Sequence, residues 1–422
     1  MSFSQALSGL NAQQQKLGAT GNNIANSQTV GFKNSDVLFA DVYAGARGIG
    51  VSVAGERQDF TQGSIEATNR DLDLAISGEG FYRLEQSTGE IGYSRNGQMS
   101  LTADGYIVNA QGDRLMGYGL DENVTEDTDD QLAFPFSDVL TGTDPIALQV
   151  YPDNMPAKET SEINAVYNFD STVDHTDPDQ LESKDIDGDG TDDIDYHFSS
   201  TYTVYDSLGT SRSITTYFEK TGDGAWNATA YMDGDAALGT STFNLTFDAS
   251  GRITGPGTEA DDFETTLAFT PPDGAEPMNV ALKLRGTTQF ASNSIQTSID
   301  QDGFATGALV GITVQEDGTV MRNFSNEQSS AAGQIVLANF RNVEGLQPLG
   351  NNLWGVTNAS GSENYGTAGT GLFGKIESGA VEASNVDLPK ELVDMIVAQR
   401  AYQANSTTIS TQDELLQTII NL

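Results

Sequence analysis

Cysteine is absent from the 422 residues, and cationic residues are scarce, at 20 against 60 aspartates and glutamates. Without cysteine the chain can form no disulfide, no thiolate metal site and no cysteine nucleophile. The formal net charge of −40 argues against binding to nucleic acid or to an anionic membrane surface. No run of about 18 apolar residues is present, so the sequence predicts no membrane insertion.

The sequence also offers little that could support catalysis or signal-directed secretion. Only two histidines occur, His175 and His197, and both lie in an acidic tract. The sequence also has no glycine-rich phosphate loop between a predicted strand and a predicted helix. We therefore predict no enzyme, no catalytic residue and no required cofactor. The first basic residue is Lys16, and no continuous apolar stretch precedes a small-residue cleavage site, so we predict no cleaved signal peptide.

The last 35 residues carry the most regular pattern in the chain, that of one long amphipathic helix. Asp387 suits the N-cap, Pro389 lies in the first turn, where its missing N–H costs little, and Glu391 adds a favourable charge. Two rows with a seven-residue spacing indicate a coiled-coil type of seam that polar residues interrupt. The first row is Leu388, Met395, Tyr402, Ile409 and Leu416, and the second is Leu392, Gln399, Ser406, Asp413 and Ile420.

The N-terminus shows a similar thin row, and neither row is strong enough to hold an isolated helix in water. Two interpretations stay open. The ends of the chain could be ordinary helices on one core, or they could pair with each other and with copies of the chain. The second interpretation predicts a self-assembly surface of Phe3, Leu7, Leu10, Leu17, Ile24, Leu388, Leu392, Met395, Tyr402, Ile409, Leu416 and Ile420.

Between the two ends the sequence predicts a mainly β protein with nested β-domains. Nine of the eleven prolines lie between 135 and 277, and residues 121–200 hold 22 Asp or Glu against two Lys, a net of −20. This shift in composition indicates an inserted outer domain, for which a β-sandwich or barrel is favoured. Asp317-Gly318 predicts a hairpin in the surrounding β-domain. The expected organisation is a terminal helical domain (1–26 and 387–422), an extended connector (27–70 and 356–386), a discontinuous β-domain (71–140 and 286–355) and the insert (141–285).

One stretch of the insert carries ligand chemistry. Residues 185–193 place aspartates at positions 1, 3, 5 and 9 and a glycine at position 6, like the first part of an EF-hand calcium loop. Position 12, where a bidentate Glu belongs, is Tyr196, so a complete EF-hand is excluded. Either a weak calcium site or a solvated acidic loop fits the pattern. The predicted calcium ligands are Asp185, Asp187, Asp189, Thr191 through its carbonyl, and Asp193.

Seven motifs occupy both ends of the chain and the start of the β-domain. They are Asn22-Asn23-Ile24-Ala25-Asn26-Ser27, Gly31-Phe32-Lys33, Leu72 to Ile76, Gly80-Phe81-Tyr82, Tyr93 to Gly97, Glu382 to Leu388 and Val397 to Asn405. Their combination is specific, and it resembles the bacterial flagellar rod and hook protein family. Residues 204–226 and 324–340 are similar to the hook members of that family, and the size of the insert favours those members over the shorter rod proteins.

The resemblance implies a structural subunit that polymerises into a short curved tube and transmits motor torque from rod to filament. It implies an extracellular location in the flagellum and export without a cleaved signal through the flagellar type III apparatus. The partners it implies are further copies of the chain, rod proteins, the hook cap and the hook–filament junction protein. Two alternatives remain, a distal rod or hook-associated axial protein and, in a different class, a calcium-stabilised adhesin, which would leave the paired terminal rows unexplained.

Overall fold

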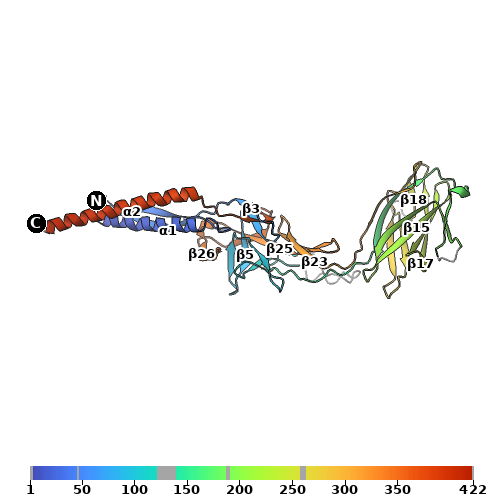
Figure 1. Ribbon diagram of the computed structural model, residues 1–422, viewed down its shortest axis with the longest axis horizontal. Helices are drawn as coiled ribbons and strands as arrows, with labels where there is room; N and C mark the ends of the chain where they lie inside the picture. Colours follow the sequence, from blue (N-terminus) through green and yellow to red (C-terminus); the bar gives the residue numbers. More distant parts are fainter. Residues whose placement is uncertain (1–2, 45–46, 121–138, 187–190, 257–262, 421–422) are drawn as a thin grey trace. The chain divides into compact units, whose positions relative to one another are not determined.

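The computed structural model describes residues 3–44, 47–120, 139–186, 191–256 and 263–420 (Figure 1). The chain divides into two compact units. The first comprises residues 1–152, 310–323 and 329–422, and the second comprises 153–309 and 324–328. The second unit thus starts and ends later in the sequence than the insert expected at 141–285. Within the described residues, no helix is both long and apolar enough to span a membrane.

The first unit contains the two long helices of the structure, α1 (Phe3–Ala25) and α2 (Leu388–Ile420). They lie side by side and run antiparallel, with both chain termini at the same end of the pair (Figure 1). Asp387 accepts a hydrogen bond from the N–H of Lys390 at 3.2 Å, so the predicted N-cap is confirmed. Both helices match the ranges expected from the seven-residue rows to within a few residues.

After α1 the chain forms a long hairpin of β1 (Ser35–Ala44) and β2 (Arg47–Gln58). Two bulges interrupt its antiparallel register. The hairpin packs along α1, where the Gln5 side chain donates to the carbonyl of Gly48 at 2.7 Å. From the sequence we expected an extended connector with short strands, such as one at Gly50–Val53, and no long hairpin. The difference arises because glycines and aspartates interrupt the alternation of apolar residues, so the pairing is visible only once the two strands meet.

The β-domain of the first unit is built around one curved sheet. Within the described residues this sheet has twelve strands, and its main path runs β23-β24-β25-β9-β5-β6-β27-β26. The predicted hairpin at Asp317-Gly318 is confirmed as the turn between β23 and β24. The strands are β5 (Phe81–Glu85), β6 (Ile91–Ser94), β7 (Ser100–Leu101), β8 (Ile107–Val108), β9 (Arg114–Tyr118), β10 (Ile146–Ala147), β23 (Leu309–Val314), β24 (Thr319–Phe324), β25 (Ser329–Phe340), β26 (Gln347–Gly350), β27 (Leu353–Gly355) and β28 (Glu363–Thr367).

Two short ladders join the chain segments next to the helices to this domain. β4 (Leu74–Ser77) pairs with β29 (Lys375–Ser378), and β3 (Ile65–Ala67) pairs with β30 (Ala380–Glu382). Because each ladder pairs an early strand with a late one, the two connecting segments lie together. A short 3-10 turn, η2 (Val343–Gly345), follows β25.

The second unit is a β-sandwich, as the sequence predicted. Two five-stranded sheets share one apolar core around Phe169, Phe218 and Trp226. One sheet contains β11 (Glu162–Asp170), β19 (Glu264–Phe269), β20 (Met278–Lys283), β21 (Thr288–Phe290) and β22 (Ile295–Gln301). The other contains β14 (Phe198–Tyr205), β15 (Ser211–Gly222), β16 (Ala225–Met232), β17 (Asp235–Phe247) and β18 (Ile253–Gly255). A small ladder of β12 (Glu182–Lys184) and β13 (Ile194–Tyr196) and a 3-10 turn, η1 (Pro178–Gln180), complete the unit.

Candidate functional site: the helix pair and its junction

Small and polar residues fill the seam between α1 and α2. Ala6 of α1 and Ala398 of α2 are almost fully buried, and they share a helix face with Gly9 and Asn405 respectively. Gly9 faces Asn405 so closely that a Cβ on Gly9 would lie 2.9 Å from the Asn405 amide nitrogen. Small side chains let two helix backbones approach each other, which places this seam along the shortest line between the axes.

The predicted self-assembly residues lie beside this seam. In the single chain Phe3, Leu7, Leu388 and Leu392 are exposed, at between 37% and 51% of their surface. Leu10, Leu17, Ile24, Met395, Tyr402 and Ile409 are half-buried, while the side chains of Leu416 and Ile420 lie outside the described part of the chain. None of the ten predicted side chains that the structure describes is fully buried in the single chain. Their burial in a polymer stays a prediction.

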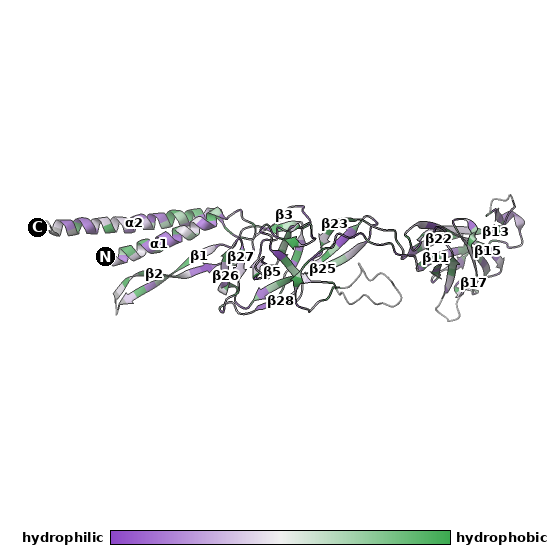
Figure 2. Cartoon of the chain, turned by 90° about the horizontal axis from the view of Figure 1, so that it is seen from below, coloured by the Kyte–Doolittle hydropathy of each residue, from purple (hydrophilic) through white to green (hydrophobic). Residues whose placement is uncertain are grey.

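The first turns of α2 carry an apolar surface that we had not predicted in full. Val393, Ile396 and Val397 are 50–59% exposed and follow the exposed Leu388 and Leu392 along the helix. Figure 2 shows hydrophobic colour at this start of α2. We call these five residues the α2 apolar face. The seven-residue rows directed attention to 388 and 392, whereas spacings of three and four residues would have added the other three.

A buried ionic cluster fixes the helix pair to the β-domain. Lys33 Nζ lies 2.6 Å from one carboxylate oxygen of Glu382, and Arg95 Nη1 lies 3.2 Å from the other. All three side chains are at least 95% buried. Burial lowers the pKa of Lys33, and the nearby Glu382 opposes that shift. Three segments far apart in the sequence therefore meet at one carboxylate.

Asparagine side chains extend this cluster toward both helices. Asn385 accepts a hydrogen bond from the N–H of Asn34 at 2.8 Å and donates to the carbonyl of Asp59 at 2.8 Å. Asn23, near the end of α1, donates to the carbonyl of Ser35 and accepts from its N–H. Asn23 and Asn385 belong to the motifs on which the family resemblance depends. Their role in the structure is to replace missing backbone partners where the helices end.

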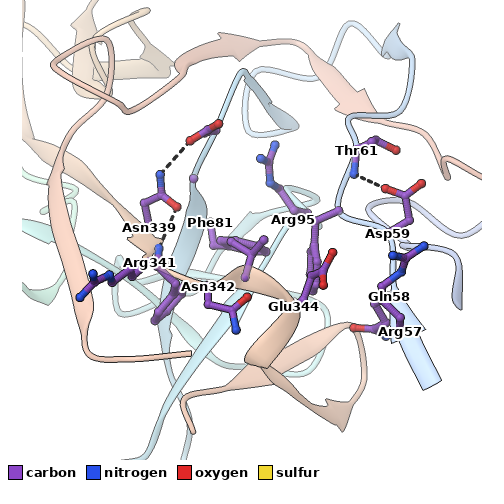
Figure 3. A pocket seen from close by; sticks show the side chains of 15 residues that line it. Arg57, Gln58, Asp59, Thr61, Phe81, Arg95, Asn339, Arg341, Asn342 and Glu344 are labelled. Carbon is purple, nitrogen blue, oxygen red and sulfur yellow. Dashed lines mark hydrogen bonds between the residues drawn. The ribbon is translucent and has the colours of Figure 1, made fainter. Parts of the chain in front are cut away.

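A cavity of about 700 Å³ opens beside this cluster. Figure 3 shows its lining, in which Arg95 lies near Phe81 and the Asn339 amide donates to the carboxylate of Glu79. Three arginines and three carboxylates line the cavity, namely Arg57, Arg95, Arg341, Asp59, Glu79 and Glu344. Because the charges are balanced, the cavity favours neither an anionic nor a cationic ligand.

The predicted calcium ligands are only partly visible. Asp187 and Asp189 lie outside the described residues. Asp193 accepts a hydrogen bond from the N–H of Ile186 at 2.8 Å, and its own N–H donates to the carbonyl of Lys184 at 2.9 Å, so it lies beside Asp185. Among the residues that the structure describes, no group of three potential metal ligands occurs. The calcium site therefore stays a prediction.

His197 of the acidic tract contacts β15 of the second unit. His197 Nδ1 accepts from the N–H of Lys220 at 3.0 Å, and burial together with the charge of Lys220 lowers the His197 pKa. Lys220 Nζ donates to the carbonyls of Ser171 and Val173. This arrangement holds a loop against the β-sandwich.

Comparison with known protein families matches four parts of the chain to flagellar proteins. Residues 4–33 match the family described as flagella basal body rod protein, and residues 75–147 match the flagellar hook protein FlgE/F/G D1 domain. Residues 168–304 match the flagellar basal body protein FlaE D2 domain, and residues 377–422 match the flagellar basal body rod FlgEFG protein C-terminal family. The second unit and the helical ends thus have separate matches.

Whole-chain comparisons agree. The chain is 42% identical to the flagellar hook protein FlgE of Salmonella typhimurium over 429 residues, covering 100% of both chains. It is 30% identical to that of Borreliella burgdorferi over 463 residues, covering 100% of this chain and 99% of the relative. The crystal structure of Helicobacter pylori flagellar hook protein FlgE2 is similar in fold, with a TM-score of 0.52 at 13% identity over 75% of this chain and 100% of that one. Identity of 42% over the whole length shows that the chain belongs to the flagellar hook protein family.

Proposed function

We propose that the protein is the structural subunit of the flagellar hook, which polymerises with copies of itself into a curved, flexible tube. In this role the tube is a universal joint that transmits motor torque from the rod to the filament. Membership of the hook protein family supports this proposal. The role is mechanical, so it requires no reaction and no catalytic residue.

The observation that carries the proposal is the α2 apolar face. Five large apolar side chains, Leu388, Leu392, Val393, Ile396 and Val397, are each 37–59% exposed on ten consecutive residues of one helix. Contiguous apolar surface of this kind marks a protein contact, because leaving it in water is unfavourable. A helix of a second copy fits the surface best, since the same chain supplies further exposed apolar residues on α1, including Phe3 and Leu7.

Repetition of one such contact produces a helical polymer. A contact between two different surfaces of the same chain is heterologous, and it generates an open filament or tube when the rotation does not close a ring. In a curved rotating tube, each subunit must change its contacts with its neighbours during every turn. The two compact units, each with its own apolar core, suit this requirement, because each can move as a rigid body.

Further parts of the proposal concern partners and location. We propose that the subunit contacts rod proteins at one end of the hook and the hook–filament junction protein at the other, and that it assembles beneath a hook cap. We propose that it reaches the outside of the cell unfolded, through the flagellar type III apparatus and without cleavage of a signal. The sequence motifs at both ends of the chain support these proposals by resemblance.

Electron microscopy of the purified full-length protein under polymerising conditions tests the proposal. We expect curved tubes from the unmodified chain and none from Val393→Asp combined with Val397→Asp, because two carboxylates in the apolar contact would have to lose their hydration. Ser410→Asp, on an exposed polar position of the same helix, is the matched control and should still form tubes. Tubes from the double variant, with circular dichroism unchanged in all three proteins, would show that the α2 apolar face is not the contact.

A further inference from the structure

The carboxylate of Glu382 completes a buried arrangement that the N-terminal part of the chain cannot complete by itself. It accepts from Lys33 Nζ at 2.6 Å, from the N–H of Gly63 at 2.9 Å and from Arg95 Nη1 at 3.2 Å. Lys33 and Glu382 are separated by 349 residues and are each 1% exposed. The only other hydrogen-bond acceptor that the described residues give the Lys33 ammonium group is the neutral carbonyl of Thr61, at 2.7 Å.

The strand that carries Glu382 is held by the β-domain, not by the N-terminal segments alone. The N–H of Gly379 donates to the carbonyl of Asp73 at 2.8 Å, and the N–H of Ala380 approaches the same carbonyl at 3.2 Å. The preceding β29 pairs with β4 of the same domain over four residues. β30 therefore has anchors that involve neither Lys33 nor Gly63.

The N-terminal segments have no comparable substitute for Glu382. If residues 31–34 and 59–67 packed on the β-domain before β30 arrived, the ammonium group of Lys33 would be buried without a carboxylate in hydrogen-bond contact, because Asp59 acts on it more weakly than Glu382 does. Burying an unpaired charge is strongly unfavourable, so the side chain would stay in water and the segment would stay unpacked. The N–H of Gly31 would also lack its acceptor, because it donates to the carbonyl of Glu382 at 2.8 Å.

We propose that Glu382 sets the order of folding at this junction: residues 31–34 and 59–67 become ordered only after β30 has joined the β-domain. The base of the helix pair therefore forms only in a chain whose C-terminal segment is present. This coupling is a property of the single chain and does not depend on the proposed assembly into a hook.

Native-state hydrogen exchange of the full-length protein tests this order with two reporter amides. The amide of Asp59 donates to the carbonyl of Asn34 at 2.9 Å, so both partners belong to the N-terminal segments. The amide of Gly379 reports on the anchoring of β30 to Asp73. We expect Glu382→Gln and Lys33→Met each to speed exchange at Asp59 by at least about tenfold and to leave Gly379 within about twofold of the unmodified protein.

Glu363→Gln is the matched control, because Glu363 also pairs with an arginine, Arg83, in the same unit but does not contact the N-terminal segments. It should leave both reporter amides unchanged. Retained protection of Asp59 in the two test variants would overturn the proposal, since the N-terminal segments would then order by themselves. Equal loss at Asp59 and Gly379 would also overturn it, because the junction would then open as one unit without an order. If Glu382→Gln does not fold, Lys33→Met decides between these outcomes with the same reporters.

Discussion

Two tyrosines on neighbouring strands of the β-domain differ in one hydrogen bond. Tyr82 on β5 and Tyr93 on β6 are both at least 98% buried. The hydroxyl of Tyr93 donates to the carboxylate of Glu363, whereas among the described residues the hydroxyl of Tyr82 has no hydrogen-bond partner. A buried hydroxyl without a partner is unfavourable. The hydroxyl of Tyr82 therefore lowers the stability of the fold, whereas the hydroxyl of Tyr93 raises it.

We expect Tyr82→Phe to raise the free energy of unfolding by roughly 1 kcal/mol, because it removes an unpaired buried oxygen. Tyr93→Phe should lower it by roughly 1.5–3 kcal/mol, because the lost hydrogen bond has a charged acceptor. Urea unfolding of the full-length protein, followed by a probe of the first unit, measures both changes. A loss of stability in Tyr82→Phe would mean that this hydroxyl is hydrogen-bonded in solution.

The same tyrosine predicts how stability changes with pH. Burial raises the pKa of Tyr82 above its ordinary value of 10.0, while the charge of Arg95 opposes the shift and that of Glu382 adds to it. Above pH 10 the unfolded chain loses this phenolic proton while the folded chain keeps it. The stabilisation is complete below pH 10 and is lost as the pH rises through the higher folded-state pKa.

Unfolding free energies at several pH values between 9 and 11.5 should therefore fall more steeply in the unmodified protein than in Tyr82→Phe. The difference in slope should approach about 1.4 kcal/mol per pH unit above pH 10. The lowered pKa of Lys33 acts in the opposite direction, because it makes stability rise with pH up to the unfolded-state lysine pKa of 10.5. This contribution cancels in the comparison, since both proteins contain Lys33. Equal slopes would show that Tyr82 ionises in the folded state as easily as in the unfolded chain.

At the scale of elements, strongly periodic or sharply punctuated segments could be predicted from the sequence. The two terminal helices, the N-cap at Asp387 and the turn at Asp317-Gly318 follow from local rules about spacing, capping and turns, and the structure confirms all of them. The sandwich of the second unit followed from composition and short alternating strands.

Contacts between distant segments could not be predicted in this way. The β1–β2 hairpin has bulges and glycines that hide its alternation, and its register depends on packing against α1. The seam of the helix pair uses small residues such as Gly9 and Ala398, which a search for large apolar residues passes over. The pairing of Lys33 with Glu382 spans 349 residues, and no local pattern in a single sequence encodes such a partner.

The acidic loop at 185–193 gives a prediction that concerns one element. Calcium bound there would stabilise the folded second unit by RT ln(1 + [L]/Kd), about 2.7 kcal/mol at a hundredfold excess over Kd. Because Tyr196 replaces the usual twelfth ligand, we expect a Kd of roughly 0.1–1 mM.

Thermal unfolding of the full-length protein with millimolar calcium and with chelator measures this effect. Calcium should raise the midpoint temperature of the second unit's transition. The double variant Asp187→Ala plus Asp189→Ala should show no such increase. Magnesium at the same concentration controls for general screening of the acidic charge. A transition that is the same with calcium, with chelator and in the double variant would identify the stretch as a solvated acidic loop.

At the scale of the whole molecule, each unit has an apolar core of its own. The core of the second unit includes 22 buried residues, among them Phe169, Phe218 and Trp226, and the core of the first unit gathers around Leu84, Leu115 and Ile335. Units with separate cores fold as separate cooperative units unless a large interface joins them.

Calorimetry of the full-length protein should therefore show two unfolding transitions. A fragment of residues 153–309 should fold and should retain one of them, with a midpoint within a few degrees of that in the full chain. Trp226→Ala should lower the midpoint of that transition by several degrees, because it removes about 3–5 kcal/mol of unfolding free energy. The midpoint of the other transition should not change. A single transition shared by both units, shifted as a whole by the same substitution, would contradict this independence.

The antiparallel arrangement of α1 and α2 also determines how their electric dipoles are compensated. Where α1 ends and α2 begins, the negative pole of one helix lies beside the positive pole of the other, so each offsets its neighbour. At the opposite end α2, with 33 residues, runs on past the 23 residues of α1, and its last turn contains no basic residue. Its negative pole therefore has no positive counterpart from α1, and a cationic side chain or a helix N-terminus from another copy would be attracted to this position.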